Sequence, residues 1–173
     1  MYEGNFPNKR YKHTIRFLSK HISTSETILD LGVKNPFTTI LTEHDFSVKN
    51  TKGEDLDIDT STIINSNANV VTAFEIFEHL LSPFTVLKAI KADKLVASVP
   101  LKLWFSSAYR SKTDMLDRHY HEFEDWQFDW LLEKAGWKIM DRKKWTNPTK
   151  KIGIRPILRW FTPRYYIIYA ERV

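Results

Sequence analysis

The chain has 173 residues, of which 42% are hydrophobic and 14% aromatic, a size that suits a single domain over residues 1–173. The absence of cysteine excludes disulfides, cysteine nucleophiles and cysteine-ligated zinc. No run of about 18 apolar residues occurs and the first residues lack a signal peptide's apolar core, so we expect a cytoplasmic protein with no membrane span. The formal net charge is +5.

Both ends of the chain are rich in basic residues. No acid occurs between Glu3 and Glu26, and none occurs between Asp141 and Glu171. Such segments can contact nucleic acid, acidic lipid or a phosphorylated substrate, but most are solvated faces, so nucleic acid is a possible partner that we do not favour. The basic residues are Lys9, Arg10, Lys12, Arg16 and Lys20 near the first end, and Arg142, Lys143, Lys144, Lys150, Lys151, Arg155, Arg159 and Arg164 near the second.

Helix and strand patterns alternate in the first half of the chain. Apolar residues recur at helical spacing within residues 1–24 and predict an N-terminal helix. Residues 27–32 predict a short buried strand. Asn35 followed by Pro36 matches an N-cap with proline at the first helical position, which predicts a second helix.

The same alternation continues in the second half. A proline or glycine ends several of the apolar runs, as expected at element boundaries. The last apolar run has almost no polar residue, so we expect that strand to be buried on both faces. The predicted strands are residues 70–74, 94–99, 137–140 and 165–170, and the predicted helices begin at Ser82 with Pro83 and cover residues 125–135.

Strand, helix, strand in this order predicts parallel pairing and a doubly wound α/β sheet. Its ligand crevice should lie at the carboxyl ends of the strands, near Asp30, Gly32, Phe74, Glu75 and Glu78. The link between the second and the middle strand is short for two crossover helices. We therefore expect an abbreviated flank there, which a partner subunit could cover in a homodimer.

Four segments carry a resemblance to a known family. They are ILDLG, VVTAFEIFEHLLSPFTVLKAI, KLVASVP and HEFEDWQFDWLLEKAGW. In this order they resemble signature segments of class I S-adenosylmethionine (SAM) dependent methyltransferases, especially small bacterial members, and the resemblance covers residues 27–173. It implies SAM-dependent methyl transfer, with S-adenosyl-L-methionine as cofactor. It also implies a Rossmann-like, mostly parallel seven-stranded sheet with helices on both faces and RYYIIYAERV as an antiparallel C-terminal strand.

The resemblance also implies the residues that would bind the cofactor. Asp30 and Gly32 match the first motif of the family, but Lys34 and Pro36 replace two later glycines, so the glycine-rich motif is degenerate. A helix starting at Asn35 could still direct free amides at the ligand. The segment GEDLDID lies where a third strand is expected, and its acids could bind the ribose or adenine or could be solvated turn acids. The expected cofactor-binding residues are Asp30, Gly32, Lys34, Asp55, Asp57, Phe74 and Glu75.

Residues 100–124 are expected to form a lid over the acceptor. The segment mixes aromatic and polar side chains, which is typical of a substrate pocket. His119 or His121 could act as the catalytic base, because the pKa of histidine lies near neutral pH. Asp117 with these two histidines could also suggest a metal, but no further ligand is evident and we expect none. The predicted substrate-binding residues are Trp104, Tyr109, Arg110 and Tyr120.

Three functions remain open from the sequence. The favoured one is a SAM-dependent methyltransferase acting on a small or carrier-attached acceptor. The second is a catalytically degenerate methyltransferase fold that serves as a binding or regulatory module. The third is an RNA methyltransferase or RNA-binding protein that uses the basic ends. The aromatic residues among the C-terminal bases, with Ile157, Leu158, Trp160 and Phe161, are expected to cover one end of the sheet.

Overall fold

The computed structural model describes residues 8–115, 117–148 and 152–173. Within these residues the chain forms one six-stranded sheet in the order β2-β1-β3-β4-β6-β5. The strands β2, β1, β3 and β4 are parallel, while β6 is antiparallel to both of its neighbours. The strands are β1 (Thr27–Asp30), β2 (Ser47–Asn50), β3 (Val70–Phe74), β4 (Lys94–Pro100), β5 (Trp137–Thr146) and β6 (Pro163–Arg172).

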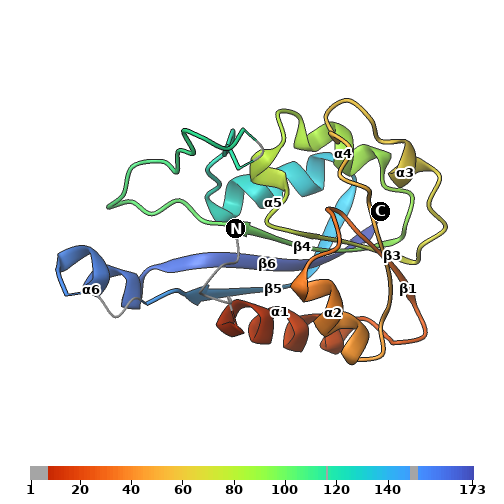
Figure 1. Ribbon diagram of the computed structural model, residues 1–173, viewed down its shortest axis with the longest axis horizontal. Coiled ribbons are helices and arrows are strands. Elements are labelled where there is room, and N and C mark those ends of the chain that lie inside the picture. The colour runs from red at the N-terminus through yellow and green to blue at the C-terminus, as the bar shows by residue number, and fades with distance from the viewer. Residues whose placement is uncertain (1–7, 116, 149–151) are drawn as a thin grey trace.

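Helices cover both faces of the sheet. Figure 1 shows α1 and α2 on one face and α3, α4 and α5 on the other. Each face buries its own cluster of side chains, with Leu18 and Phe37 on the first face and Val86 and Phe128 on the second. The doubly wound α/β fold with an antiparallel C-terminal strand is thereby confirmed. The helices are α1 (Asn8–His21), α2 (Pro36–Glu43), α3 (Ser61–Ile64), α4 (Pro83–Ala89), α5 (Asp125–Lys134) and α6 (Ile154–Phe161), with a 3₁₀ turn η1 (Phe77–His79).

The flank beside β2 is abbreviated, as predicted, because residues 51–69 contain only the one-turn helix α3. The strand expected in residues 53–59 does not form, and the described residues contain six strands instead of seven. The reason is local hydrogen bonding. The Asp55 carboxylate accepts from the Asp57 amide (3.0 Å), and the Asp55 carbonyl accepts from the Asp59 amide (2.8 Å). A segment closed by these turns cannot extend along a sheet edge.

Strand β5 is longer than predicted. It continues past Met140 to Thr146, through a run of charged residues. Successive side chains of this edge strand point to opposite faces. Asp141 pairs with Lys20 and His21 at the end of α1, whereas Arg142 and Lys144 pair with Asp129 and Asp125 of α5. The charged run therefore continues the strand, with its side chains paired to helices on both faces, and does not mark the end of the strand.

Helix α6 differs from the prediction. None of its residues is buried, so the expectation that Ile157, Leu158, Trp160 and Phe161 cover one end of the sheet is wrong. Figure 1 shows α6 beyond the helical layers, at the end of β5 and β6. Ile157, Trp160 and Phe161 are all mostly exposed.

Among the described residues, no helix has both the length and the apolar character needed to cross a membrane.

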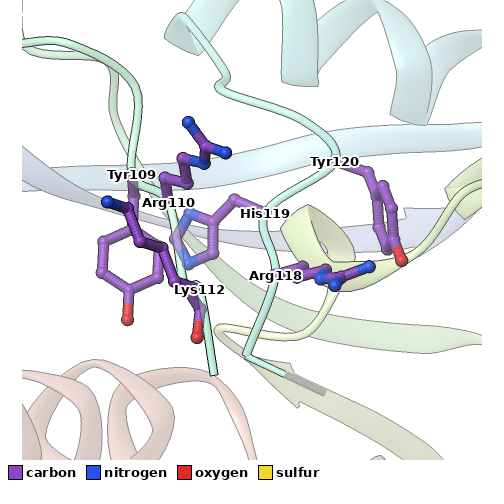
Figure 2. Close-up of a pocket in the computed structure, with 7 residues that line it drawn as sticks. Tyr109, Arg110, Lys112, Arg118, His119 and Tyr120 are labelled. Carbon is purple, nitrogen blue, oxygen red and sulfur yellow. The ribbon is translucent and has the colours of Figure 1, made fainter. Parts of the chain in front are cut away.

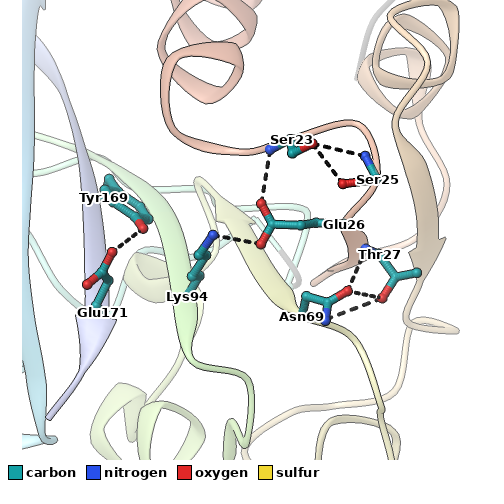
Figure 3. A network of polar contacts seen from close by, with 8 residues as sticks. All are labelled: Ser23, Ser25, Glu26, Thr27, Asn69, Lys94, Tyr169 and Glu171. Atoms are coloured by element: carbon teal, nitrogen blue, oxygen red, sulfur yellow. Dashed lines mark hydrogen bonds and ion pairs between the residues drawn. The ribbon is translucent and has the colours of Figure 1, made fainter.

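Polar side chains join the chain at the amino ends of the parallel strands (Figure 3). The Asn69 side chain accepts from both the amide and the hydroxyl of Thr27, each at 2.9 Å, which ties the start of β1 to the start of β3. The Lys94 ammonium lies 2.7 Å from the Glu26 carboxylate, and the same carboxylate accepts from the Ser23 amide (3.0 Å). These contacts fix the strand starts, and the opposite ends of the strands remain for a ligand.

Candidate functional site

A cavity of about 780 Å³ opens at the carboxyl ends of β1, β3 and β4. Its walls come from these strand ends, from α1, from residues 53–57 and from the long loop after β4. Lys34 is exposed and is not among the lining residues. Of the residues predicted to bind the cofactor, those that line the cavity are Asp30, Gly32, Asp55, Asp57, Phe74 and Glu75.

Asp30 ends β1 and is buried at the base of this cavity. Its carboxylate accepts from the Thr72 hydroxyl (2.5 Å) and from the Asn50 amide group (3.1 Å), so it joins β1 to both neighbouring strands. Burial raises the pKa of Asp30 to about 7, against the opposing effect of these two hydrogen bonds. Near neutral pH the side chain therefore exchanges a proton while holding the strand ends together.

Gly32 and Asn35 shape the turn between β1 and α2. Gly32 has a φ of +119°, a conformation that residues with a Cβ rarely adopt, and its amide donates to the Thr51 hydroxyl (2.7 Å). Asn35 is the N-cap of α2, as predicted, and its side chain accepts from the amides of Phe37 (2.8 Å) and Thr38 (3.3 Å). The expectation of free amides at this helix start is therefore wrong for these two groups.

The acidic segment before α3 lies along one side of the cavity. The Asp57 carboxylate accepts from the amides of Leu81 and Ser82, both at 2.8 Å. These bonds give partners to backbone amides just before α4, where the Ser82 side chain makes no cap contact with the helix amides. Asp57 has a structural role in this arrangement, while the exposed Asp55 keeps more of its carboxylate free to meet a ligand.

Glu75 follows β3 and holds an unusual conformation. Its φ is +58°, which is uncommon for a residue other than glycine, and such strain is often found at functional sites. The carboxylate accepts from the Ser98 hydroxyl (3.0 Å) and lies 3.4 Å from the Arg10 guanidinium. Burial raises the pKa of Glu75, and the charge of Arg10 opposes that shift. Helix α1 thus brings a cation to the pocket.

Glu78, His79 and His119 meet beside Glu75. One ligand atom from each of these three residues lies within 4.8 Å of the other two. The Nε2 atom of His79 is 3.7 Å from a Glu78 carboxylate oxygen, and the rings of the two histidines lie edge to face at 4.7 Å. The loop after β4, which carries His119, is held beside Glu78 because the amides of Tyr120 and His121 donate to the Glu78 carbonyl (2.8 and 3.2 Å).

The two histidines predicted as bases occupy different places. His119 lines the cavity, and burial together with the charges of His79 and Arg164 lowers its pKa to about 4. His119 is therefore neutral at pH 7, and a group with so low a pKa is a weak base for an alcohol. His121 is not among the lining residues, and its Nε2 donates to the Leu81 carbonyl (3.3 Å). Either base role stays a prediction.

A second pocket of about 470 Å³ adjoins the cavity within the loop after β4. Figure 2 shows its walls, in which residues 109–112 face residues 118–120. Tyr109, His119 and Tyr120 line both pockets. The basic side chains around the smaller pocket belong to Arg110, Lys112 and Arg118.

The aromatic residues predicted to bind substrate are divided by the structure. The Tyr109 hydroxyl donates to Asp117, and the Tyr109 ring lies 4.5 Å from that of His119. Trp104 is 73% exposed, contacts the ring of Phe105 and lines neither pocket. The structure therefore brings Tyr109, Arg110 and Tyr120 to the smaller pocket and leaves Trp104 outside, and their binding of a substrate stays a prediction.

The sequence did not identify several residues that line the cavity. Arg10 was expected on the outward side of α1, and Arg164 was assigned to a solvated basic segment. Their positions depend on how α1 and β6 pack at the strand ends, which the sequence does not show. The only local sign of a place at the cavity was a basic residue directly before a tyrosine, as in Arg10 with Tyr11 and Arg164 with Tyr165. The residues missed in this way are Arg10, Tyr11, Thr14, Thr51, Ser98, Arg164 and Tyr165.

Comparisons with known proteins identify the fold. The chain matches no protein-family model, and no curated protein matches it in sequence. A SAM-dependent methyltransferase structure from Methanosarcina mazei superimposes with a TM-score of 0.66 and 12% identity, covering 91% of this chain and 97% of that one. The 1,6-didemethyltoxoflavin-N1-methyltransferase of Burkholderia thailandensis, solved with S-adenosylhomocysteine, gives a TM-score of 0.65 and 14% identity over 94% of this chain and 78% of that one.

A third structure with this fold is named for a different reaction. The [4+2]-cyclase SpnF superimposes with a TM-score of 0.59 and 12% identity, covering 98% of this chain and 84% of that one. The chain therefore has the fold seen in SAM-dependent methyltransferases. Because one fold can carry different reactions, the function has to be argued from the site.

Proposed function

We propose that the chain is a SAM-dependent methyltransferase that transfers a methyl group to a small or carrier-attached acceptor. One observation carries this proposal. Six residues assigned to cofactor binding from the sequence, spread from Asp30 to Glu75, line a single cavity. Its volume is within the range of roughly 300–1,000 Å³ that small-molecule sites occupy. The methyltransferase fold and the position at the strand ends support the same conclusion.

The charges of the cavity complement those of SAM. The methionine end of SAM carries one ammonium and one carboxylate. Arg10 and Glu75 lie side by side at the cavity wall and offer one group of each opposite sign. Asp55 supplies a carboxylate that can accept from the ribose hydroxyls or the adenine amino group. Gly32 leaves the backbone open where the cofactor would pass β1.

Methyl transfer requires mainly the alignment of two reactants. Bound SAM would supply the methyl group: its sulfur–carbon bond would break as the acceptor atom bonds to that carbon, leaving S-adenosylhomocysteine, and the proton of the acceptor would pass to solvent. A pocket that excludes water and holds both partners in line supplies much of the rate acceleration. Tyr109, His119 and Tyr120 connect the two pockets and are placed to orient the acceptor.

The smaller pocket indicates the chemistry of the acceptor. Arg110, Lys112 and Arg118 surround it (Figure 2), and none of the other residues lining it is an acid. Guanidinium and ammonium groups in this arrangement favour phosphate or carboxylate. We infer that the acceptor is anionic, either as a small molecule or through the carrier that holds it.

Calorimetric titration with SAM and with S-adenosylhomocysteine tests the cofactor assignment. Asp55→Ala should weaken binding of either ligand by about tenfold, because a hydrogen bond to a charged group contributes roughly 1.5–3 kcal/mol. Asp59→Ala is a matched control. Asp59 is also exposed and also accepts from one backbone amide, that of Ser61 (2.8 Å), but it does not line the cavity. The control variant should bind like the wild type.

The same titration separates the alternatives. No measurable heat with either ligand would contradict the proposed function. Cofactor binding without methyl transfer to any anionic acceptor would favour a degenerate binding module. Methylation of RNA, with affinity that falls steeply as salt rises, would favour the nucleic-acid alternative.

A further inference from the structure

We propose that Glu78, His79 and His119 form a binding site for a divalent metal ion at the acceptor side of the cavity. The sequence predicted no metal, because the only histidine pair it considered was His119 with His121. The structure instead pairs His119 with His79, forty residues earlier in the chain, and places a carboxylate beside them.

Glu78 supplies the first independent argument. Its side chain is 1% exposed, and its Oε2 atom has no hydrogen-bond partner among the described residues. A buried carboxylate oxygen without a partner is costly, and such groups are normally hydrogen-bonded or bound to a cation. The two guanidinium groups of the cavity have other contacts, since Arg10 pairs with Glu75 (3.4 Å) and Arg164 donates to the Leu101 carbonyl (2.6 Å). A metal ion would provide the partner that the Oε2 atom lacks.

The orientation of His79 supplies the second argument. Its Nδ1 lies 3.0 Å from the Arg118 carbonyl, which can only accept, so Nδ1 carries the proton. The lone pair is therefore on Nε2, the atom that lies 3.7 Å from the Glu78 carboxylate. Metal-bound histidines commonly donate their other ring nitrogen to a backbone carbonyl in this way, which fixes the ring and its tautomer.

The ligand set indicates which ions would fit. Two imidazoles and one carboxylate suit Zn²⁺, Co²⁺, Mn²⁺ or Fe²⁺, whereas Mg²⁺ and Ca²⁺ prefer all-oxygen sites. Ligand atoms at about 2.0–2.2 Å from one zinc ion lie about 3.3–3.5 Å apart, so ligand atoms that are as much as 4.8 Å apart would have to close by up to about 1.4 Å. The half-exposed loop that carries His119 can supply this adjustment.

A metal held by three protein ligands keeps a position open. All three residues line the large cavity, so the open position faces the space assigned to the acceptor. On the proposed function, an acceptor hydroxyl bound there would release its proton more readily, which would favour methylation at oxygen. The metal site itself does not depend on that function, because it follows from the side chains alone.

Titration of the chelator-treated full chain with ZnCl₂ and CoCl₂ tests the site. We expect one ion per chain with a dissociation constant in the micromolar range or tighter. His79→Ala and His119→Ala should each weaken binding at least tenfold. His44→Ala is the matched control, because His44 is the exposed C-cap of α2 and its Nδ1 also contacts a backbone carbonyl, that of Ile40 (2.9 Å), with no carboxylate partner among the described residues. The control should bind like the wild type. Thermal melting without metal checks that each variant is folded.

Cobalt adds a readout that reports the ligands directly. Cobalt in a low-coordinate nitrogen and oxygen site absorbs visible light more strongly than the aqueous ion, and this band should be lost in the His119→Ala variant. No saturable binding by the wild type would overturn the proposal, as would equal binding by His119→Ala. Metal binding without SAM binding would contradict only the proposed function, and SAM binding without metal binding would contradict only this inference.

Discussion

The charged groups at the two ends of the parallel strands differ in their burial and in their pairing. At the amino ends, Glu26 meets Lys94 and Asn69 bridges to Thr27, and these groups are partly open to water (Figure 3). At the carboxyl ends, Asp30 and Glu78 are buried and Glu75 is mostly buried, and removal from water raises the pKa of all three. One of these carboxylates also has an oxygen without a partner.

This contrast indicates a division of roles within one sheet. Buried charge and a left-handed backbone at Glu75 cost stability, and such costs persist where function requires them. The contacts at the amino ends compensate by fixing the starts of β1, β3 and β4. We therefore expect substitutions at the carboxyl end to raise stability and substitutions at the amino end to lower it.

The largest effect should come from Asp30→Asn, measured against pH. The folded protein holds a proton on Asp30 up to about pH 7, whereas the unfolded chain releases it near 3.8. The stability gained from this group is thus complete below pH 3.8 and is lost as the pH rises to about 7, on the order of 4 kcal/mol in total. Relative to the variant, the wild type should lose stability between pH 4 and 7. Urea unfolding of both proteins at several pH values measures this, and parallel stability curves would contradict it.

A smaller gain is expected from Glu78→Gln in metal-free protein at pH 8. Glutamine keeps the shape of the side chain and removes the buried charge, which should raise the free energy of unfolding by about 1–3 kcal/mol. Glu133→Gln is the control, because Glu133 is exposed on α5 and should change stability by less than about 0.5 kcal/mol. A loss of stability in Glu78→Gln would mean that the carboxylate is favourably paired.

The smallest effect should come from Asn69→Ala at the amino end. The variant loses both contacts with Thr27, and the free energy of unfolding should fall by about 1 kcal/mol because the contacts are exposed. SAM affinity should be unchanged, since Asn69 precedes β3 at its amino end and does not line the cavity. Asn67→Ala, which removes an exposed neighbouring amide, should be neutral. A change in SAM affinity for Asn69→Ala would show that the two ends are coupled.

The sequence predicted the parts of the fold that local patterns determine. The buried runs at β1, β3 and β4 and the cap formed by Asn35 and Pro36 are local signals, and all were confirmed. The strand expected at residues 53–59 is missing, because turn contacts of Asp55 and Asp57 compete with extension. The sequence offered turn acids there as an alternative but could not decide between the two. The length of β5 was hidden by its run of consecutive charged residues, whose ion-pair partners on α1 and α5 lie far away in the sequence.

The candidate site was predictable to a lesser degree. Residues at strand ends, such as Asp30 and Glu75, could be assigned because the topology brings strand ends together. The contact between His79 and His119 could not, because it depends on the loop after β4 folding back onto the Glu78 carbonyl. Arg10 reaches the cavity only through the packing of α1 on the sheet.

The loop after β4 begins and ends at one place, because Leu101 pairs with Phe123 and the Lys102 amide donates to the Phe123 carbonyl (2.8 Å). Everything between these residues can be exchanged without rethreading the sheet. Doubling the length of such a loop costs only about 0.6 kcal/mol in closure entropy. The segment that carries Tyr109, Arg110 and Arg118 is thus a replaceable insertion, through which evolution or a protein engineer could change one wall of the cavity while keeping the walls formed by the strand ends and α1.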